Sequence, residues 1–150
     1  MITAKEIKAL REATGLSITQ CQKALEEAGG DQEQAILLLK KQGASIAAKK
    51  SGHALGAGIV ASYIHTGETV GVILELLCET DFVAKNPEFR VVARDISMHI
   101  AAMNPLDTEE LLAQPFIKDN TQTIQSLINN TVQKFGERTE VGRFMRLALN

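Results

Sequence analysis

Residues 69–89 read TVGVILELLCETDFVAKNPEF, and the larger part of the chain is expected to fold around them. The first ten form a nearly unbroken apolar run, which is typical of a buried strand. A second β-rich run, IVASYIH at 59–65, comes before it, and a short turn with Thr66 and Gly67 separates the two. Strand-forming residues on both sides of a turn that contains Gly predict a β-hairpin.

A helix is expected to follow this stretch. Asn86 is a suitable N-cap, Pro87 suits the first helical position, and Glu88 places an acidic group in the first turn. Apolar residues then recur on one side of the segment, and the helix should end before Asn104-Pro105, because proline disfavours helical geometry in the residue before it.

Two more elements complete this part of the chain. Thr121 is the expected cap of a helix that Gly136 closes, and EVGRFMRLAL at 140–149 indicates a last strand. The order is then two strands, two helices and one strand. This order predicts an α+β fold in which a small antiparallel sheet, made of the β-hairpin and the C-terminal strand, packs with helices.

The first 42 residues contain three helix starts. Each is a capping residue followed three positions later by Glu or Gln: Thr3 with Glu6, Ser17 with Gln20, and Asp31 with Gln34. Glycines should end these helices at Gly15, at Gly29-Gly30 and near Gly43. The pattern predicts a compact three-helix module.

Small residues dominate 43–58, GASIAAKKSGHALGAG. This composition predicts a helical extension through Lys50 and then a flexible linker. The expected organisation is therefore a three-helix domain at 1–43, a helical extension and linker at 44–58, and an α+β core domain at 59–150, through which the chain would dimerise.

Bulk composition excludes several function classes. The chain has 150 residues, 16 basic against 18 acidic, so its formal charge of −2 gives no general attraction to nucleic acid or to an anionic membrane. Aromatics make up only 4 %, which argues against stacking platforms for single strands. The N-terminus shows no signal peptide and no run is long enough to span a bilayer, so the expected location is the cytoplasm.

Few side chains carry chemistry in a recognisable pattern. His53, His65 and His99 lack metal-ligand spacing such as HExxH, so no metal site is expected. The glycines of 52–58 follow no strand, which argues against a phosphate-binding loop. Two distant cysteines make no disulfide framework, and the interpretation is two reduced, partly buried thiols.

One catalytic arrangement stays open from the residues alone. Cys78, Asp81 and His99 could meet in space as nucleophile, orienting group and base of a cysteine hydrolase. The simpler interpretation puts Cys78 at the end of a strand, facing the core.

The TDFV turn, residues 80–83, raises a sharper question, because it places an aromatic where the chain leaves the core. One interpretation is a helix start, with Thr80 as N-cap, Asp81 favouring the helix dipole, and both Phe82 and Val83 tucked back on the sheet. The other is that a capped turn after a strand is a rigid mount that holds an apolar side chain outward, as a wedge for a partner's pocket. The residues leave both open.

The segment ELLCETDFVAKNPEF at 75–89 closely resembles the signature of the elongation factor Ts family, the exchange factors of elongation factor Tu. LREATGLSITQCQKALEEAGGDQEQAILLLKKQGASIAAKK at 10–50 is similar to that family's N-terminal module. SMHIAAMNP at 97–105 and QPFIKD at 114–119 also look familial, so the resemblance covers nearly the whole chain.

The resemblance implies a fold, a partner and contact residues. The N-terminal module would be of ubiquitin-associated type and would dock on elongation factor Tu through the second helix, at Ile18, Thr19, Cys21 and Lys23. The TDFV turn would enter near the partner's magnesium site, with Asp81 and Phe82 foremost and His99 as a further contact. No cofactor and no covalent chemistry are implied, so the chain would not be an enzyme.

The chain also departs from longer family members. Only a dozen residues lie between Met103 and Phe116, which leaves no room for a coiled-coil insertion, and only one core unit is visible. The short family form, together with the apolar strand at 140–149, predicts a homodimer or a 2:2 assembly with elongation factor Tu. An alternative from another class is a ubiquitin-associated adaptor module, which would leave the TDFV turn unexplained.

Overall fold

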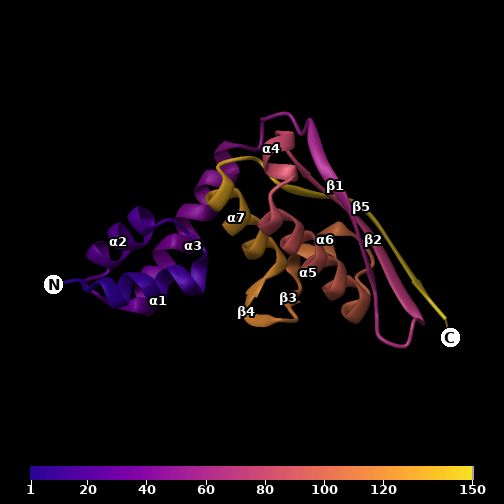
Figure 1. Ribbon diagram of the computed structural model, residues 1–150, viewed down its shortest axis with the longest axis horizontal. Coiled ribbons are helices and arrows are strands. Elements are labelled where there is room, and N and C mark those ends of the chain that lie inside the picture. Colours follow the sequence, from indigo (N-terminus) through magenta and orange to yellow (C-terminus); the bar gives the residue numbers. More distant parts are fainter. Residues whose placement is uncertain (150) are drawn as a thin grey trace.

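The computed structural model describes residues 1–149, so Asn150, the last residue of the expected core domain, lies outside the described part. The molecule is elongated, with the N-terminal helices at one end and a β-sheet at the other (Figure 1). The N-terminal helices precede the strands, and the main sheet is small and antiparallel. The predicted α+β class is therefore confirmed.

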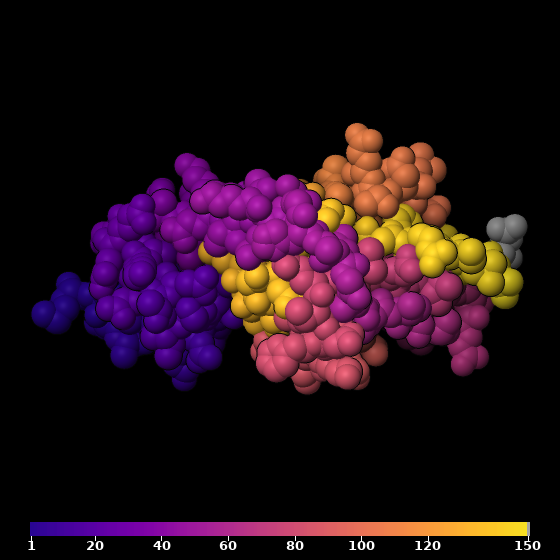
Figure 2. Space-filling model, turned by 90° about the horizontal axis from the view of Figure 1, so that it is seen from above, coloured from indigo at the N-terminus to yellow at the C-terminus, as the bar shows by residue number. Residues whose placement is uncertain are grey.

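The N-terminal end of the molecule begins with α1 (Ala4–Thr14) and α2 (Ile18–Glu27), both of which start at the predicted caps. Both capping boxes form, and each satisfies backbone N–H groups that lack a partner inside the helix. The helices enclose a buried cluster of their own, made of Leu10, Leu16, Cys21, Ala24, Leu25, Ala35 and Leu39. Figure 2 shows this part as a lobe at one end of the molecule.

Helix α3 (Gln32–Lys49) starts at the predicted cap Asp31, but it does not stop near Gly43. It runs through that glycine into the predicted helical extension. A glycine inside a helix costs about 1 kcal/mol relative to alanine, and here it allows a close approach. A Cβ at position 43 would lie 2.8 Å from Gln133 Oε1 and 3.4 Å from the Asn129 carbonyl oxygen, both of which belong to a second helix near the C-terminus.

That helix, α7 (Ile124–Phe135), belongs to the second buried cluster, which fills the rest of the molecule. The N-terminal half of α3 packs in the first cluster, whereas Ile46 and Ala47 pack against the second. A further bond ties the two parts, since Asn130 Nδ2 donates to the Thr14 carbonyl oxygen at 3.1 Å. The structure thus shows one helix shared by two hydrophobic clusters.

The sheet consists of β1 (Ala57–Ile64), β2 (Val70–Cys78) and β5 (Glu140–Ala148), in the order β1-β2-β5. Both pairs are antiparallel, with Ala61 opposite Leu74 and Ile73 opposite Met145. The predicted hairpin and the predicted C-terminal strand are therefore confirmed, each to within two residues at its ends.

The two faces of the sheet have different surroundings. Alternate residues of β2 point inward, and α5 (Pro87–Met103) packs against that face. Helix α5 starts at the predicted Asn86 cap and ends at Asn104, which adopts the left-handed conformation. The opposite face, called here the outer sheet face, carries exposed apolar side chains: Val60, Ile64, Ile73, Met145 and Leu147.

Between α5 and α7 the chain forms α6 (Thr108–Ala113) and a small strand pair, β3 (Pro115–Phe116) with β4 (Asp119–Thr123). The expectation that Thr121 caps the following helix is wrong, because Thr121 lies within β4. Thr123 is the N-cap of α7, and its hydroxyl accepts from the Ser126 N–H.

Candidate functional site

The TDFV turn begins immediately after β2. It forms α4 (Asp81–Ala84), a single helical turn with Thr80 as N-cap, whose hydroxyl accepts from the Val83 N–H at 3.4 Å. The predicted helix start is therefore present. Asp81 is exposed in the first turn, where a negative charge favours the helix dipole.

The two apolar residues of this turn differ sharply in burial. Val83 is buried in the core together with Ala84, which fixes the turn to the body of the molecule. Phe82 is 86 % exposed. The interpretation that both side chains tuck back onto the sheet is thus correct for Val83 and wrong for Phe82, which stands in solvent beside the Asp81 carboxylate.

A carboxylate from a distant part of the chain holds the base of this turn. Glu137, between α7 and β5, accepts from the backbone N–H groups of Glu79 and Thr80 through Oε1, at 3.1 and 3.0 Å. Its Oε2 accepts from the Thr80 hydroxyl at 2.7 Å. The hydroxyl therefore donates to Glu137 while it accepts from Val83, so one side chain both caps α4 and anchors it.

Glu79 makes the reciprocal contact. Its carboxylate accepts from the Arg138 N–H and lies 2.8 Å from His53 Nδ1. The Arg138 hydrogen bond, assisted by the His53 contact, holds the pKa of Glu79 below its ordinary value. Arg138 in turn donates from Nη1 to the His53 carbonyl oxygen at 2.6 Å, so the segment before β1 joins the same cluster. The name carboxylate clasp is used below for Glu79, Thr80, Glu137 and Arg138.

Cys78 lies beneath the turn and is fully buried. Its Sγ donates to the Thr80 carbonyl oxygen at 3.3 Å. Burial raises the pKa of the Cys78 thiol, and the nearby Glu137 charge raises it further. A nucleophilic cysteine needs the opposite shift, towards the thiolate.

His99 is also fully buried, on α5. Its Nδ1 accepts from the Ile117 N–H at 3.2 Å, so the proton sits on Nε2, which lies 2.9 Å from Gln114 Oε1. Burial holds the pKa of His99 below its ordinary value. A direct contact of its side chain with a partner, as the resemblance implies, is not available in this conformation.

The hydrolase arrangement is not assembled. Cys78 donates to the Thr80 carbonyl oxygen, and His99 bonds to Gln114 and Ile117. These two residues therefore bond neither to each other nor to Asp81. Both side chains are closed to solvent, and the thiol pKa is raised. The cysteine hydrolase hypothesis is therefore wrong for this conformation.

The four α2 residues that the resemblance implicates divide into two groups. Ile18, Thr19 and Lys23 are exposed, with Ile18 at 56 %. Cys21 is fully buried in the first cluster, where its sulfur approaches the Thr14 hydroxyl at 3.7 Å. The implied direct contact is therefore not available to Cys21, whose place is in the core that supports α2.

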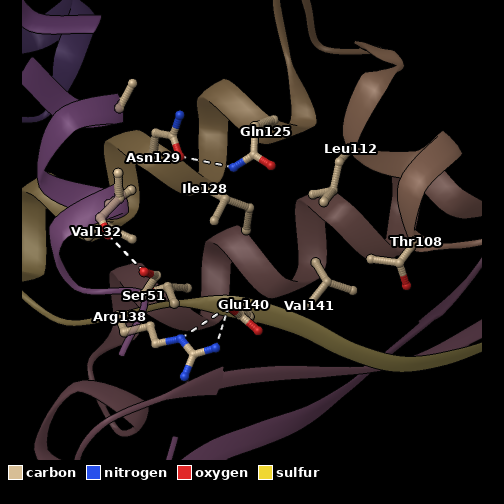
Figure 3. Close-up of a pocket in the computed structure, with 14 residues that line it drawn as sticks. Ser51, Thr108, Leu112, Gln125, Ile128, Asn129, Val132, Arg138, Glu140 and Val141 are labelled. Atoms are coloured by element: carbon tan, nitrogen blue, oxygen red, sulfur yellow. Dashed lines mark hydrogen bonds and ion pairs between the residues drawn. The ribbon is translucent and has the colours of Figure 1, made fainter. Parts of the chain in front are cut away.

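A groove of about 510 Å³ lies elsewhere, between the C-terminal end of α3, α6, α7 and the start of β5. Figure 3 shows its mixed lining: Leu112, Ile128 and Val141 are apolar, and the Arg138 guanidinium at another side of the groove donates to Glu140 at 2.7 and 3.0 Å. Within residues 1–149, no three His, Cys, Asp or Glu side chains gather as metal ligands would. No helix in the described chain is long and apolar enough to cross a membrane.

Comparison with known proteins gives a consistent result. The family model described as elongation factor TS matches residues 79–150. The elongation factor Ts of Geotalea uraniireducens is 38 % identical, over 99 % of this chain and 89 % of that protein. The elongation factor Ts of Desulforamulus reducens is 40 % identical over 97 % of this chain and 88 % of that protein. The elongation factor Ts of Trichlorobacter lovleyi is 43 % identical over 96 % of this chain and 46 % of that protein.

These alignments also show a difference in length. The alignment with the Geotalea uraniireducens protein spans 193 positions, whereas this chain has 150 residues in all. At least 43 of those positions are therefore gaps in this chain, so the relative has residues that this chain lacks.

Proposed function

The chain belongs to the elongation factor Ts family, and on that basis we propose that it is a guanine nucleotide exchange factor that acts on elongation factor Tu. Family likeness covers nearly the whole chain, so the adaptor hypothesis, which rests on the three-helix module alone, is not needed. The expected place of action is the cytoplasm, where translation elongation takes place.

The exposed Phe82 is the observation that carries this proposal. A large aromatic in solvent gains nothing for the folded monomer, whereas aromatics are prominent among the residues that dominate interfaces. Its backbone is held by a capped helical turn, by buried Val83 and by Glu137. The TDFV turn is therefore suited to enter a partner's surface without first losing conformational freedom.

The proposed mechanism needs no covalent step. A GTPase holds its nucleotide through backbone donors and a magnesium ion that bridges phosphate oxygens. A wedge made by Asp81 and Phe82 that displaces the elements around this ion weakens GDP binding. Coupling of binding energies is reciprocal, so GTP binding then weakens the hold of the factor and releases it.

We propose that the N-terminal module, of ubiquitin-associated type, supplies the second contact. Ile18, Thr19 and Lys23 form an exposed patch on α2 with an apolar, a hydroxyl and a cationic side chain. Cys21 and His99 act from the interior in this proposal, by supporting α2 and α5 respectively.

We also propose that two chains associate through the outer sheet face. Its five apolar side chains are each more than half exposed, on three adjacent strands, and α5 covers only the other face. A hollow of about 460 Å³ on the same face is lined by Val60, Ile73, Phe144 and Met145 among others. A second copy of this face would cover these groups, giving a homodimer or a 2:2 complex with elongation factor Tu.

The test of the exchange function follows release of a fluorescent GDP analogue from elongation factor Tu. The intact chain should accelerate release strongly, and the double variant Asp81→Ala, Phe82→Ala should lose most of the acceleration while it keeps its fold. Leu106→Ala is the matched control, because Leu106 is 88 % exposed but lies outside the TDFV turn. Equal acceleration by the double variant and the parent would rule out the wedge.

A further inference from the structure

We propose that Glu137 is a positioning residue for exchange: it sets where the TDFV turn holds Phe82, although it does not itself meet the partner. This inference rests on the proposed function, and it adds a residue that lies more than fifty positions away from the turn along the chain. The observation that supports this inference is the carboxylate clasp, in which the Glu137 side chain accepts three hydrogen bonds from two consecutive residues at the base of α4.

The geometry explains why β2 ends where it does. Past Cys78, the N–H groups of Glu79 and Thr80 no longer pair with a neighbouring strand and instead donate to Glu137 Oε1. Hydrogen bonds to a carboxylate are stronger than those between neutral groups. The chain therefore leaves the sheet in a fixed direction, and α4 starts from a fixed point.

Thr80 transmits this restraint to Phe82. Its hydroxyl hydrogen points at Glu137 Oε2, which leaves oxygen lone pairs free to accept from the Val83 N–H. Without Glu137, that hydroxyl can rotate and donate elsewhere, and the cap loses its fixed orientation. Val83 keeps its burial in the core, but Phe82, being exposed, has no packing of its own to hold it in place.

Glu79 secures Glu137 from the other side. Its bond to the Arg138 N–H fixes the residue next to Glu137, and its contact with His53 reaches the segment that leads into β1. The two carboxylates thus cross, each holding backbone N–H groups of the other's segment. The turn and the α7–β5 connection are expected to move as one unit.

The experiment compares Glu137→Ala, Glu137→Gln and Phe82→Ala, alone and combined, in the GDP-release assay with the full chain over a range of factor concentrations. We expect Glu137→Ala to lower the maximal release rate on the order of 10- to 100-fold, as misplacement of a positioned group by about 1 Å does. Glu137→Gln should recover part of the rate, because its amide oxygen can still accept from both N–H groups, whereas its NH₂ cannot accept from the Thr80 hydroxyl. Glu109→Ala, on the exposed face of α6, is the matched control and should resemble the parent.

Combination with Phe82→Ala separates positioning from a general loss of structure. If Glu137 acts through Phe82, then Glu137→Ala has little further effect once Phe82 is gone. An equal loss in both backgrounds, or an unchanged rate in Glu137→Ala, would overturn the proposal.

Amide hydrogen exchange on the free chain tests the clasp without the partner. Glu137→Ala should speed exchange at the Glu79 and Thr80 N–H groups, while the centre of α5 stays protected. Unchanged exchange at these two N–H groups would overturn the proposal. A parent chain that fails to accelerate GDP release would instead reject the proposed function, so the two failures can be told apart.

Discussion

The outer sheet face gives the most demanding prediction, because one substitution affects the assembly and spares the monomer. Met145 lies on β5 opposite Ile73 and is 65 % exposed. Met145→Ala therefore removes little that the folded monomer uses, and its unfolding free energy should stay within about 0.5 kcal/mol of the parent. The same side chain, on the edge strand β5, is one of the five apolar groups that a second copy is proposed to cover.

The size of the effect follows from exposure and symmetry. Full burial of a methionine side chain contributes about 1.5–3 kcal/mol, and roughly two thirds of this one remains to be buried, which leaves about 1–2 kcal/mol. A two-fold interface contains the residue twice, so the dimer should lose about 2–4 kcal/mol. Because 1.4 kcal/mol is a factor of ten, the dissociation constant should rise about 30- to 1000-fold.

Sedimentation equilibrium over a dilution series measures this change directly. The parent should shift from dimer to monomer at much lower concentration than Met145→Ala does. Met103→Ala is the control, since Met103 is 45 % exposed at the end of α5 and away from the sheet face. A parent chain that stays monomeric throughout, or a variant that associates as tightly as the parent, would refute the proposed dimer face.

Three further outcomes are expected. Burial lowers the folded-state pKa of His99, so the full stability that the neutral ring contributes is present above about pH 6.5. Below that pH, the unfolding free energy should fall by up to about 1.4 kcal/mol per pH unit. Urea unfolding at several pH values should show this slope in the parent and a flatter one in His99→Gln. Phe89→Ala should cost about 3–5 kcal/mol in the same assay, because Phe89 is fully buried and meets Phe135 edge to face at 6.1 Å. Cys21 and Cys78 are both fully buried, so a thiol reagent should modify them slowly in the native chain and rapidly in denaturant; rapid native labelling would contradict their placement.

Local signals in the sequence predicted most of the elements. The three N-terminal caps and the Asn86-Pro87 helix start depend on neighbours within a few positions, and the structure has them where expected. The hairpin and the last strand were readable from β-rich runs. Helix α3 was cut short in the prediction because Gly43 looks like a stop, whereas its packing on α7 decides the outcome.

The candidate site was only partly readable. The TDFV sequence predicted a capped helix start. It could not show whether Phe82 or Val83 faces the core, because a single helical turn is too short to show a periodic pattern of apolar residues. Glu137 was missed altogether, since its contacts with Thr80 join residues 57 positions apart and a lone acidic residue after Gly136 has no distinctive pattern. The β3–β4 pair was missed for a related reason: a two-residue strand has no alternation to detect.

The unbroken course of α3 bears on how the two proposed contacts, at the α2 patch and at Phe82, act together. Since the helix joins both hydrophobic clusters without a flexible joint, the α2 patch and Phe82 are carried at a set separation. In the proposed complex, once one of them engages, the other is presented to its own binding pocket at a high effective concentration, with no linker to immobilise. Avidity can then come from geometry, so neither proposed contact has to be tight, and in the proposed mechanism, where GTP releases the factor, contacts that are individually weak are an advantage.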